Sequence, residues 1–266
     1  MNKRVIVITG AASGLGLALA QKAAERGFDV AVADVQQEAG ELAARELVSR
    51  GVDARFFHCD VSQTDALLTL KNQVIEHFGQ VDVLVNNAGV GSQGMLTDTT
   101  EEEWQRQWQI NVMGVVRGCQ AFIPQLKKQS GSAVVNVASF AALALAPGMA
   151  SYNVAKAGVL ALSETLRGEL AADGVHVAVA CPAFFKTNLV DSMQESDDQI
   201  KQQINRWMER SKYTAEDVAT MILDAVKQKQ FMVLCDQQTR WQYRIARWFP
   251  NYFYKQKLKM MKRMFR

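Results

Sequence analysis

The sequence predicts a single α/β domain built on a doubly wound, parallel sheet of seven strands. Short runs rich in valine, isoleucine, alanine and phenylalanine alternate along the chain with longer amphipathic segments. Most of these runs show little polar alternation, which is typical of strands covered on both faces. Repeated strand–helix–strand units then give a parallel sheet with helices on both sides.

The predicted strands are Val5–Ile8, Val30–Ala33, Ala54–Phe57, Val81–Val85, Ala133–Val137, His176–Ala180 and Phe231–Leu234. The helical patterns are Leu15–Arg26, Glu38–Arg50, Asp65–Phe78, Glu101–Gln129 and Tyr152–Ala172, with a final helix from Thr214. The stretch 184–213 is polar and lacks a strand pattern, so we expect a mobile insertion there. Because no linker rich in Pro, Gly or Ser divides the body, we expect one domain over residues 1–236.

Charge is distributed unevenly along the chain. The net charge is +3, but the thirty residues Gln237–Arg266 hold nine Lys/Arg and no acid. Residues 1–236 therefore hold 21 basic and 27 acidic side chains, a balance of −6. This acidic body argues against nucleic-acid binding. The sequence thus predicts a separate basic and aromatic tail over 237–266.

The four cysteines, Cys59, Cys119, Cys181 and Cys235, are widely spaced. They lack metal-ligand spacing, so we expect reduced core thiols in a cytoplasmic protein and no metal site. The basic and apolar N-terminus resembles a short secretory signal, but three glycines interrupt it, and we expect the segment to be retained. No uninterrupted run of about 18 apolar residues predicts a spanning helix.

A glycine-rich loop, TGAASGLG, directly follows the first strand and contains Gly10, Ser13, Gly14, Leu15 and Gly16. Glycines allow a tight turn and a close approach to a pyrophosphate, which the positive N-terminus of the next helix attracts. The spacing is G-x-x-x-G-x-G and not the general G-x-G-x-x-G. A glycine loop is a weak signal alone, but its place between strand and helix predicts a dinucleotide site.

Asp34 closes the second strand, eighteen residues beyond Gly16. A carboxylate there accepts hydrogen bonds from both adenosine-ribose hydroxyls and repels a 2′-phosphate. The next basic residue is Arg45, well inside the following helix. The pattern favours NAD over NADP, and the alternative is a surface aspartate at a strand end.

Two further segments extend the predicted site. Asp60 and Val61 follow the third strand, and Asn87, Ala88 and Gly89 follow the fourth. Ligands of open α/β sheets bind at the carboxyl ends of the strands. We therefore expect both segments to contact the cofactor, although the second could be only a polar turn.

Tyr152 and Lys156 stand four residues apart in SYNVAKAG, one helical turn, and so share a helix face. Such a spacing occurs often by chance on amphipathic helices. Five ordered motifs give it more weight, namely TGAASGLG, NNAG, QINVMG, VNVAS and YNVAK. In these motifs the chain resembles the short-chain dehydrogenase/reductase family over about residues 4–236.

The resemblance implies a Rossmann-like fold and an oxidoreductase that moves a hydride between nicotinamide and a carbinol or carbonyl carbon. It implies that Tyr152 is the general acid/base, Lys156 its activator, Ser139 the substrate-orienting hydroxyl and Asn111 the holder of a water chain behind Lys156. It also implies that Tyr152 and Lys156 bind the cofactor. Free tyrosine has a pKa near ~10, and an adjacent ammonium with an oxidised nicotinamide would lower it.

The resemblance also implies cofactor contacts from Pro182 and Thr187, and it contains one departure. Ala183 occupies a position where the family usually has glycine. Alanine has less backbone freedom, so we expect a reshaped pocket with cofactor binding retained.

The predicted substrate side is apolar. Phe140–Met149, Phe184–Phe185, Val90 and Met95 suggest a lipophilic alcohol or ketone. Each of these residues could instead serve only packing. Lys186 and Arg206 are the basic residues that could meet a carboxylate. The resemblance further suggests a homodimer or homotetramer formed through the two long helices.

In the tail, the five residues Trp241, Ile245, Trp248, Phe249 and Tyr252 fall at helical spacing among arginines. Aromatic and basic residues together are typical of helices that lie on an anionic membrane surface. The alternative is a tail packed across a subunit interface. For the whole chain, the alternatives to an NAD-dependent enzyme are an NADPH-dependent carbonyl reductase and a non-catalytic dinucleotide-binding sensor or scaffold.

Overall fold

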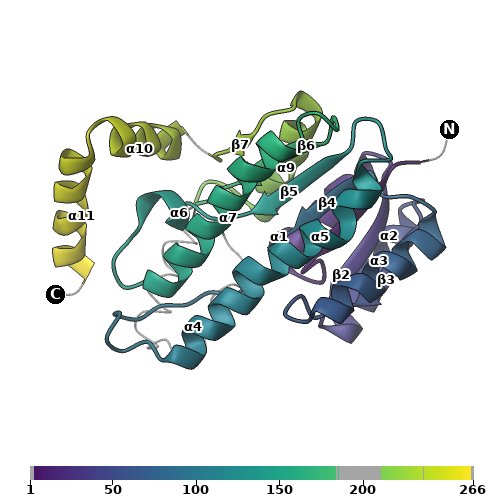
Figure 1. The fold of residues 1–266 in the computed structure, drawn as a ribbon, viewed down its shortest axis with the longest axis horizontal. Coiled ribbons are helices and arrows are strands. Elements are labelled where there is room, and N and C mark those ends of the chain that lie inside the picture. The colour runs from purple at the N-terminus through teal and green to yellow at the C-terminus, as the bar shows by residue number, and fades with distance from the viewer. Residues whose placement is uncertain (1–2, 184, 186–210, 236, 265–266) are drawn as a thin grey trace.

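The computed structural model describes residues 3–183, 185, 211–235 and 237–264 (Figure 1). Seven parallel strands form one sheet in the order β3-β2-β1-β4-β5-β6-β7. Their bounds are β1 Val5–Thr9, β2 Asp29–Asp34, β3 Ala54–His58, β4 Val83–Asn86, β5 Ala133–Val137, β6 His176–Ala180 and β7 Met232–Val233. The predicted fold class and all seven strands are confirmed.

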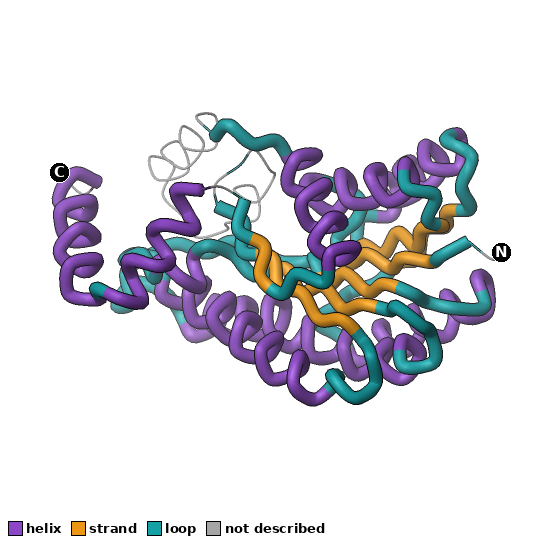
Figure 2. The backbone as a smooth tube through the Cα atoms, turned by 90° about the horizontal axis from the view of Figure 1, so that it is seen from above, coloured by secondary structure: helices purple, strands orange, loops and turns teal. Residues whose placement is uncertain are grey.

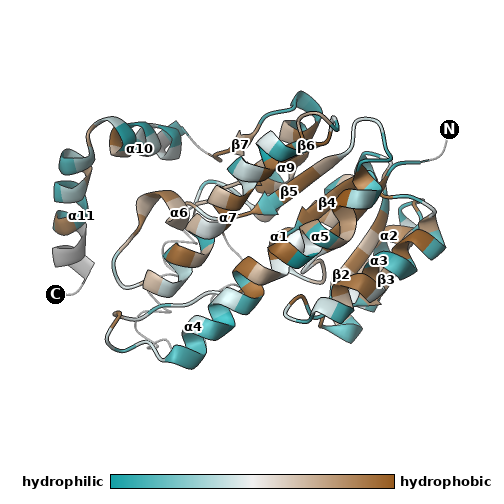
Figure 3. Cartoon of the chain, in the orientation of Figure 1, coloured by the Kyte–Doolittle hydropathy of each residue, from teal (hydrophilic) through white to brown (hydrophobic). Residues whose placement is uncertain are grey.

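Helices cover both faces of the sheet (Figure 2). Helices α1 (Gly14–Glu25), α2 (Gln37–Ser49) and α9 (Ala215–Gln228) bury their apolar sides in one core cluster. Helices α3 (Thr64–Phe78), α5 (Gly114–Leu126) and α7 (Ala150–Glu169) bury theirs in a second cluster on the other face. The strands are apolar on both faces for this reason, and they form the brown centre of Figure 3.

The order of the strands places the site. β1 pairs with β2 on one side and with β4 on the other, so the strand order reverses its direction at β1. The loops that follow β1 and β4 therefore lead to helices on opposite faces of the sheet, and a crevice forms between the two loops. The glycine loop and the segment after β4 both begin at this point.

The predicted helix Glu101–Gln129 is divided. It consists of α4 (Glu101–Trp108), a π-helical turn (Gln109–Met113) and α5. A π-helical turn inserts an extra residue into the helix and is frequent at functional sites. Asn111 lies within it, so the irregular turn is located where the sequence predicts a site residue.

Three helices were not predicted in their observed form. The four-residue helix α6 (Ala141–Ala144) lies within the apolar stretch between Ser139 and Tyr152. The tail forms two helices, α10 (Gln237–Trp248) and α11 (Pro250–Met264), in place of one continuous helical face. Pro250 has no N–H to continue the ladder of α10, and it is well suited to the first turn of α11.

Candidate active site

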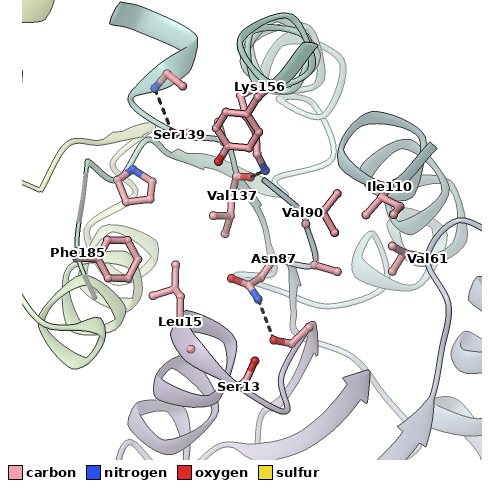
Figure 4. A pocket seen from close by; sticks show the side chains of 18 of the residues that line it. Ser13, Leu15, Val61, Asn87, Val90, Ile110, Val137, Ser139, Lys156 and Phe185 are labelled. Carbon is pink, nitrogen blue, oxygen red and sulfur yellow. Dashed lines mark hydrogen bonds between the residues drawn. The ribbon is translucent and has the colours of Figure 1, made fainter. Parts of the chain in front are cut away.

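A cavity of about 720 Å³ opens at the carboxyl ends of the strands (Figure 4). It joins the predicted cofactor loops to the predicted substrate side. The predicted site residues that line it are Gly10, Ser13, Gly14, Leu15, Asp34, Asp60, Val61, Asn87, Ala88, Gly89, Ser139, Tyr152, Lys156 and Pro182. Thr187 lies outside the described residues, and Gly16 and Asn111 lie behind the lining.

The glycine loop is packed so closely that side chains are excluded. Gly10 has a φ of +66°, and a Cβ there would stand 2.9 Å from the Cα of Ala88. A Cβ at Gly16 would stand 1.9 Å from the carbonyl oxygen of Gly10. Gly16 therefore serves the close approach of α1 to the loop, while Ser13, Gly14 and Leu15 face the cavity.

Polar groups at the end of β4 hold this loop in place. The amide of Asn87 donates from Nδ2 to the carbonyl oxygens of Thr9 (2.9 Å) and Gly10 (3.1 Å). The hydroxyl of Thr9 accepts from the backbone N–H groups of Asn87 (3.0 Å) and Ala88 (3.1 Å). Thr9 was not predicted, and its place as the last residue of the first strand is the signal that could have found it.

Asp34 is buried at the end of β2, with an exposed fraction of 6%. Its Oδ2 accepts from the N–H of Ala12 (2.9 Å) and its Oδ1 from the N–H of Gln36 (3.0 Å). These bonds fix the carboxylate at the cavity wall, and each oxygen keeps acceptor capacity for a ligand. Asp60 is held similarly, by the N–H of Ser62 at 2.9 Å.

These features fit a dinucleotide. The N-terminus of α1 faces the cavity, and Ser13 at its N-cap makes no capping side-chain bond. The glycine cradle that a Cβ would fill and a fixed carboxylate complete the pattern for a pyrophosphate and a ribose. Among the described residues that line the cavity, Lys156 is the only Lys or Arg.

Tyr152 and Lys156 come from α7 and meet Ser139, which follows β5. The Ser139 side chain acts on the phenol of Tyr152 and favours its deprotonated form. The Nζ of Lys156 donates to the carbonyl oxygen of Val137 (3.0 Å) and lies 5.7 Å from the centre of the Tyr152 ring. Figure 4 shows Ser139 and Lys156 facing Leu15 and Ser13 across the cavity.

Burial dominates the titration of both groups. It raises the pKa of Tyr152 to about 12, against a smaller opposite effect of the hydrogen bond with Ser139. Burial also lowers the pKa of Lys156 to about 8. The expected lowering of the Tyr152 pKa does not come from the polypeptide, because removal from water outweighs the effect of its neighbours.

Asn111 is fully buried and does not reach the cavity. Its Nδ2 donates to the carbonyl oxygen of Val90 (2.9 Å) and its Oδ1 accepts from the N–H of Val90 (3.1 Å). A Cβ on Gly89 would stand 2.6 Å from Oδ1 of Asn111 and 3.3 Å from Nζ of Lys156. Asn111 and Lys156 thus lie against the same glycine, and the water chain between them stays a prediction.

Two further residues of α4 support Asn111 and were missed in the sequence. The Oε1 of Gln107 accepts from Nδ2 of Asn111 at 2.6 Å. The Nε2 of Gln107 donates to the carbonyl oxygen of Gly91 (3.0 Å) and to Glu103 (2.9 Å). Gln107 and Glu103 are buried, and their spacing of four residues from one another and from Asn111 is a usable signal.

The substrate side of the cavity is apolar, as predicted. Its lining includes Val90, Ile110, Phe140, Ala141, Ala144, Ala146, Met149 and Phe185. We name residues 140–149 the substrate-side loop, and Asn153 holds it by a bond from Nδ2 to the carbonyl oxygen of Ala146 (2.7 Å). Met95 is not part of the lining and is 43% exposed, so its predicted place was wrong.

Residue Ala183 lines the cavity without backbone strain. Leu145 and Lys229 are the non-glycine residues with positive φ in the described part of the chain, and Ala183 is not among them. Alanine is accommodated there because the backbone does not need the left-handed conformation. Phe184, Lys186 and Arg206, three other predicted contributors, lie outside the described residues.

A family model described as short chain dehydrogenase matches residues 4–198. The chain belongs to the short-chain dehydrogenase family. The reductase FabG of Staphylococcus epidermidis, a 3-oxoacyl-[acyl-carrier-protein] reductase, is 34% identical over 206 residues, which cover 77% of this chain and 84% of FabG. The probable oxidoreductase EphD of Mycobacterium tuberculosis is 33% identical over 85% of this chain, which spans only 40% of the length of EphD.

Solved structures agree with this assignment. A short-chain dehydrogenase/reductase from Burkholderia phymatum in complex with NAD has a TM-score of 0.87 at 32% identity, covering 92% of this chain and 93% of its own. An alcohol dehydrogenase from Thermococcus sibiricus complexed with 5-hydroxy-NADP has a TM-score of 0.77 at 28% identity, covering 87% and 95%. The family and a nicotinamide dinucleotide cofactor are therefore supported together.

Proposed function

We propose that this protein is an NAD-dependent oxidoreductase that interconverts lipophilic secondary alcohols and ketones. The observation that carries the proposal is that Ser139, Tyr152 and Lys156 line the same cavity as the glycine loop, and Figure 4 shows Ser139 and Lys156 facing Ser13 and Leu15 across it. The family membership and the ligands of the two solved relatives support the cofactor class.

A nicotinamide dinucleotide supplies the hydride donor or acceptor when it is bound. Gly10, Gly14 and Asp34 would hold its adenosine and pyrophosphate part, and Lys156 would hold the nicotinamide ribose. In alcohol oxidation, the phenol oxygen of Tyr152 takes the hydroxyl proton as the hydride leaves the carbinol carbon. In ketone reduction, Tyr152 returns that proton to the oxygen, and Ser139 donates a hydrogen bond to the same oxygen.

The titration of Tyr152 makes the two directions differ in their dependence on pH. With a pKa of about 12, the phenol keeps its proton at neutral pH and is ready to donate it to a carbonyl oxygen. Alcohol oxidation needs the deprotonated phenol, so its rate should rise with pH. The positive charge of an oxidised nicotinamide would lower the pKa of Tyr152 and assist this direction.

The preference for NAD rests on Asp34. Its carboxylate is fixed by the N–H groups of Ala12 and Gln36, so it cannot easily turn away from a 2′-phosphate. The described cavity wall near Asp34 also lacks a Lys or Arg that would pair with such a phosphate. The alternative, an NADPH-dependent carbonyl reductase, is favoured by the likeness to FabG and to the enzyme complexed with 5-hydroxy-NADP.

A screen of secondary alcohols with NAD and NADP, and of ketones with NADH and NADPH, tests the proposal at the nicotinamide absorbance band. Tyr152→Phe should reduce turnover by about three orders of magnitude or more while dinucleotide binding persists. Tyr213→Phe, a partly buried tyrosine away from the cavity lining, is the matched control. Full turnover by Tyr152→Phe would exclude its acid/base role.

The cofactor preference has its own test. Asp34→Ala should move the ratio of kcat/KM values toward NADP, since the repulsion of a 2′-phosphate is removed. An unchanged ratio would contradict our assignment of NAD. Dinucleotide binding without turnover on any alcohol or ketone would instead favour a non-catalytic sensor. Assembly into a homodimer or homotetramer through the long helices and a cytoplasmic location stay predictions.

A further inference from the structure

The two tail helices, α10 and α11, project from the end of the molecule farthest from the N-terminus (Figure 1). The base of α10 is anchored. Thr239 is 3% exposed, Arg240 donates from Nε to the carbonyl oxygen of Leu234 (3.3 Å), and Tyr243 packs against the second core cluster. The tail is therefore a fixed part of the fold at its start, while its far end leaves the body.

Large aromatic side chains are exposed where the two helices meet. Trp248 is 76% exposed, Phe249 is 65% exposed and Tyr252 is 56% exposed. We name these three residues the aromatic corner. Large exposed apolar groups that gather in one place mark an interaction surface, and tryptophan and tyrosine favour the boundary between water and lipid.

The charge around the aromatic corner has one sign. The segment Gln237–Arg266 carries nine Lys/Arg and no Asp or Glu, whereas the rest of the chain has a balance of −6. Arg244, Arg247, Lys255 and Lys259 on the described helices are exposed. No Asp or Glu of the segment itself offsets this charge, and the charge complements an anionic surface.

The tail also contacts a segment that lines the cavity. The Nζ of Lys257 donates to the carbonyl oxygens of Ala144 (3.1 Å) and Leu145 (3.5 Å), which end α6. Ala144 lines the cavity, and Leu145 caps α6 with a φ of +50°. A lysine at these carbonyls satisfies a helix C-terminus and ties α11 to the substrate-side loop.

We propose that α10 and α11 form a membrane-binding surface, in which the aromatic corner enters the headgroup region of an anionic phospholipid bilayer and the flanking basic residues pair with lipid phosphates. The mode is interfacial, because in the part of the chain that the structure describes no helix is both long and apolar enough to cross a bilayer. A second copy of this chain fits less well, since an aromatic interface between copies would bring the two basic tails together. The binding does not depend on the proposed catalytic activity.

Co-sedimentation of the full chain with vesicles tests the proposal. The wild-type protein should sediment with vesicles of phosphatidylcholine mixed with phosphatidylglycerol, and not with phosphatidylcholine alone. Added salt should weaken the binding, because it screens the charges. The double variant Trp248→Ser/Phe249→Ser should bind roughly tenfold less, since apolar area drives insertion. Trp108→Ser, which removes a 46% exposed tryptophan of α4, is the matched control and should bind as wild type does.

Two double charge-reversal variants, one in the tail and one on the body, show whether binding depends on the position of the charges or only on the net charge. Arg244→Glu/Lys255→Glu in the tail should abolish binding to the anionic vesicles. Lys71→Glu/Lys128→Glu, which changes the net charge equally on the body, should not. Equal losses in both pairs, or equal sedimentation of wild type and the aromatic double variant, would overturn the proposal. So would a wild-type dimer in light scattering that Trp248→Ser/Phe249→Ser dissociates without a change in vesicle binding.

Discussion

Replacing Lys156 by methionine should stabilise the fold near neutral pH while it abolishes turnover. Lys156 is 4% exposed, and burial lowers its pKa from 10.5 to about 8. Each pKa unit corresponds to about 1.4 kcal/mol, so holding the buried ammonium at neutral pH costs about 3 kcal/mol. The lost bond to the carbonyl of Val137 offsets about 1 kcal/mol. The variant should therefore be more stable by about 2 kcal/mol.

The sign of this difference depends on pH in a defined way. Above about pH 8 the folded protein releases the Lys156 proton, whereas the unfolded chain keeps it until about pH 10.5. The unfolded state then binds more protons, so the wild type gains stability as pH rises through this window. The gain between about pH 7 and about pH 9.5 is about 2 kcal/mol, and Lys156→Met lacks it. The higher stability of Lys156→Met relative to the wild type should therefore disappear near the upper end of this pH window.

Urea unfolding of the cofactor-free proteins, followed by circular dichroism at several pH values, measures this difference. Burial raises the pKa of Cys59 and Cys119 to about 12, which lowers stability at alkaline pH in both proteins and cancels in the comparison. The control Lys128→Met replaces an exposed lysine, and its free energy of unfolding should differ from that of the wild type by the same amount at every pH. A Lys156→Met difference that is equally constant would refute the desolvation argument.

Three further substitutions test the loop, the support of the site and the tail contact. Gly16→Ala should destabilise the protein by about 2 kcal/mol and weaken dinucleotide binding in calorimetry, because its Cβ would stand 1.9 Å from a carbonyl oxygen of the glycine loop. Gly168 has open space around it, so the control Gly168→Ala should not destabilise the protein. Gln107→Leu removes an acceptor for the amide of Asn111 and should lower kcat more than it raises the KM for the dinucleotide. Lost stability with an unchanged kcat would show that Gln107 has only a structural role. Lys257→Met releases the substrate-side loop and should raise the KM for the alcohol without changing that for the dinucleotide.

Much of the cofactor half was predictable because its signals are local. A glycine needed at a strand–helix turn, such as Gly10, and an acid at a strand end, such as Asp34, are constrained by backbone geometry within a few residues. The rule that ligands bind at the carboxyl ends of parallel strands then gathers these segments into one site. The seven strands were predictable for a related reason, since burial on both faces leaves an apolar run in the sequence.

The sequence by itself therefore determined the fold, the family and the residue types at the cavity. Only the tertiary structure decided which of these residues contact one another and how burial changes their pKa values, because both depend on segments that are distant in the sequence. It buried Tyr152, and this burial raises the pKa of the phenol to about 12 against a smaller opposite effect of Ser139. It also placed Asn111 in a π-helical turn behind Gly89 and brought Lys257 to a helix end 113 residues earlier in the chain. No local pattern carries contacts between segments so far apart.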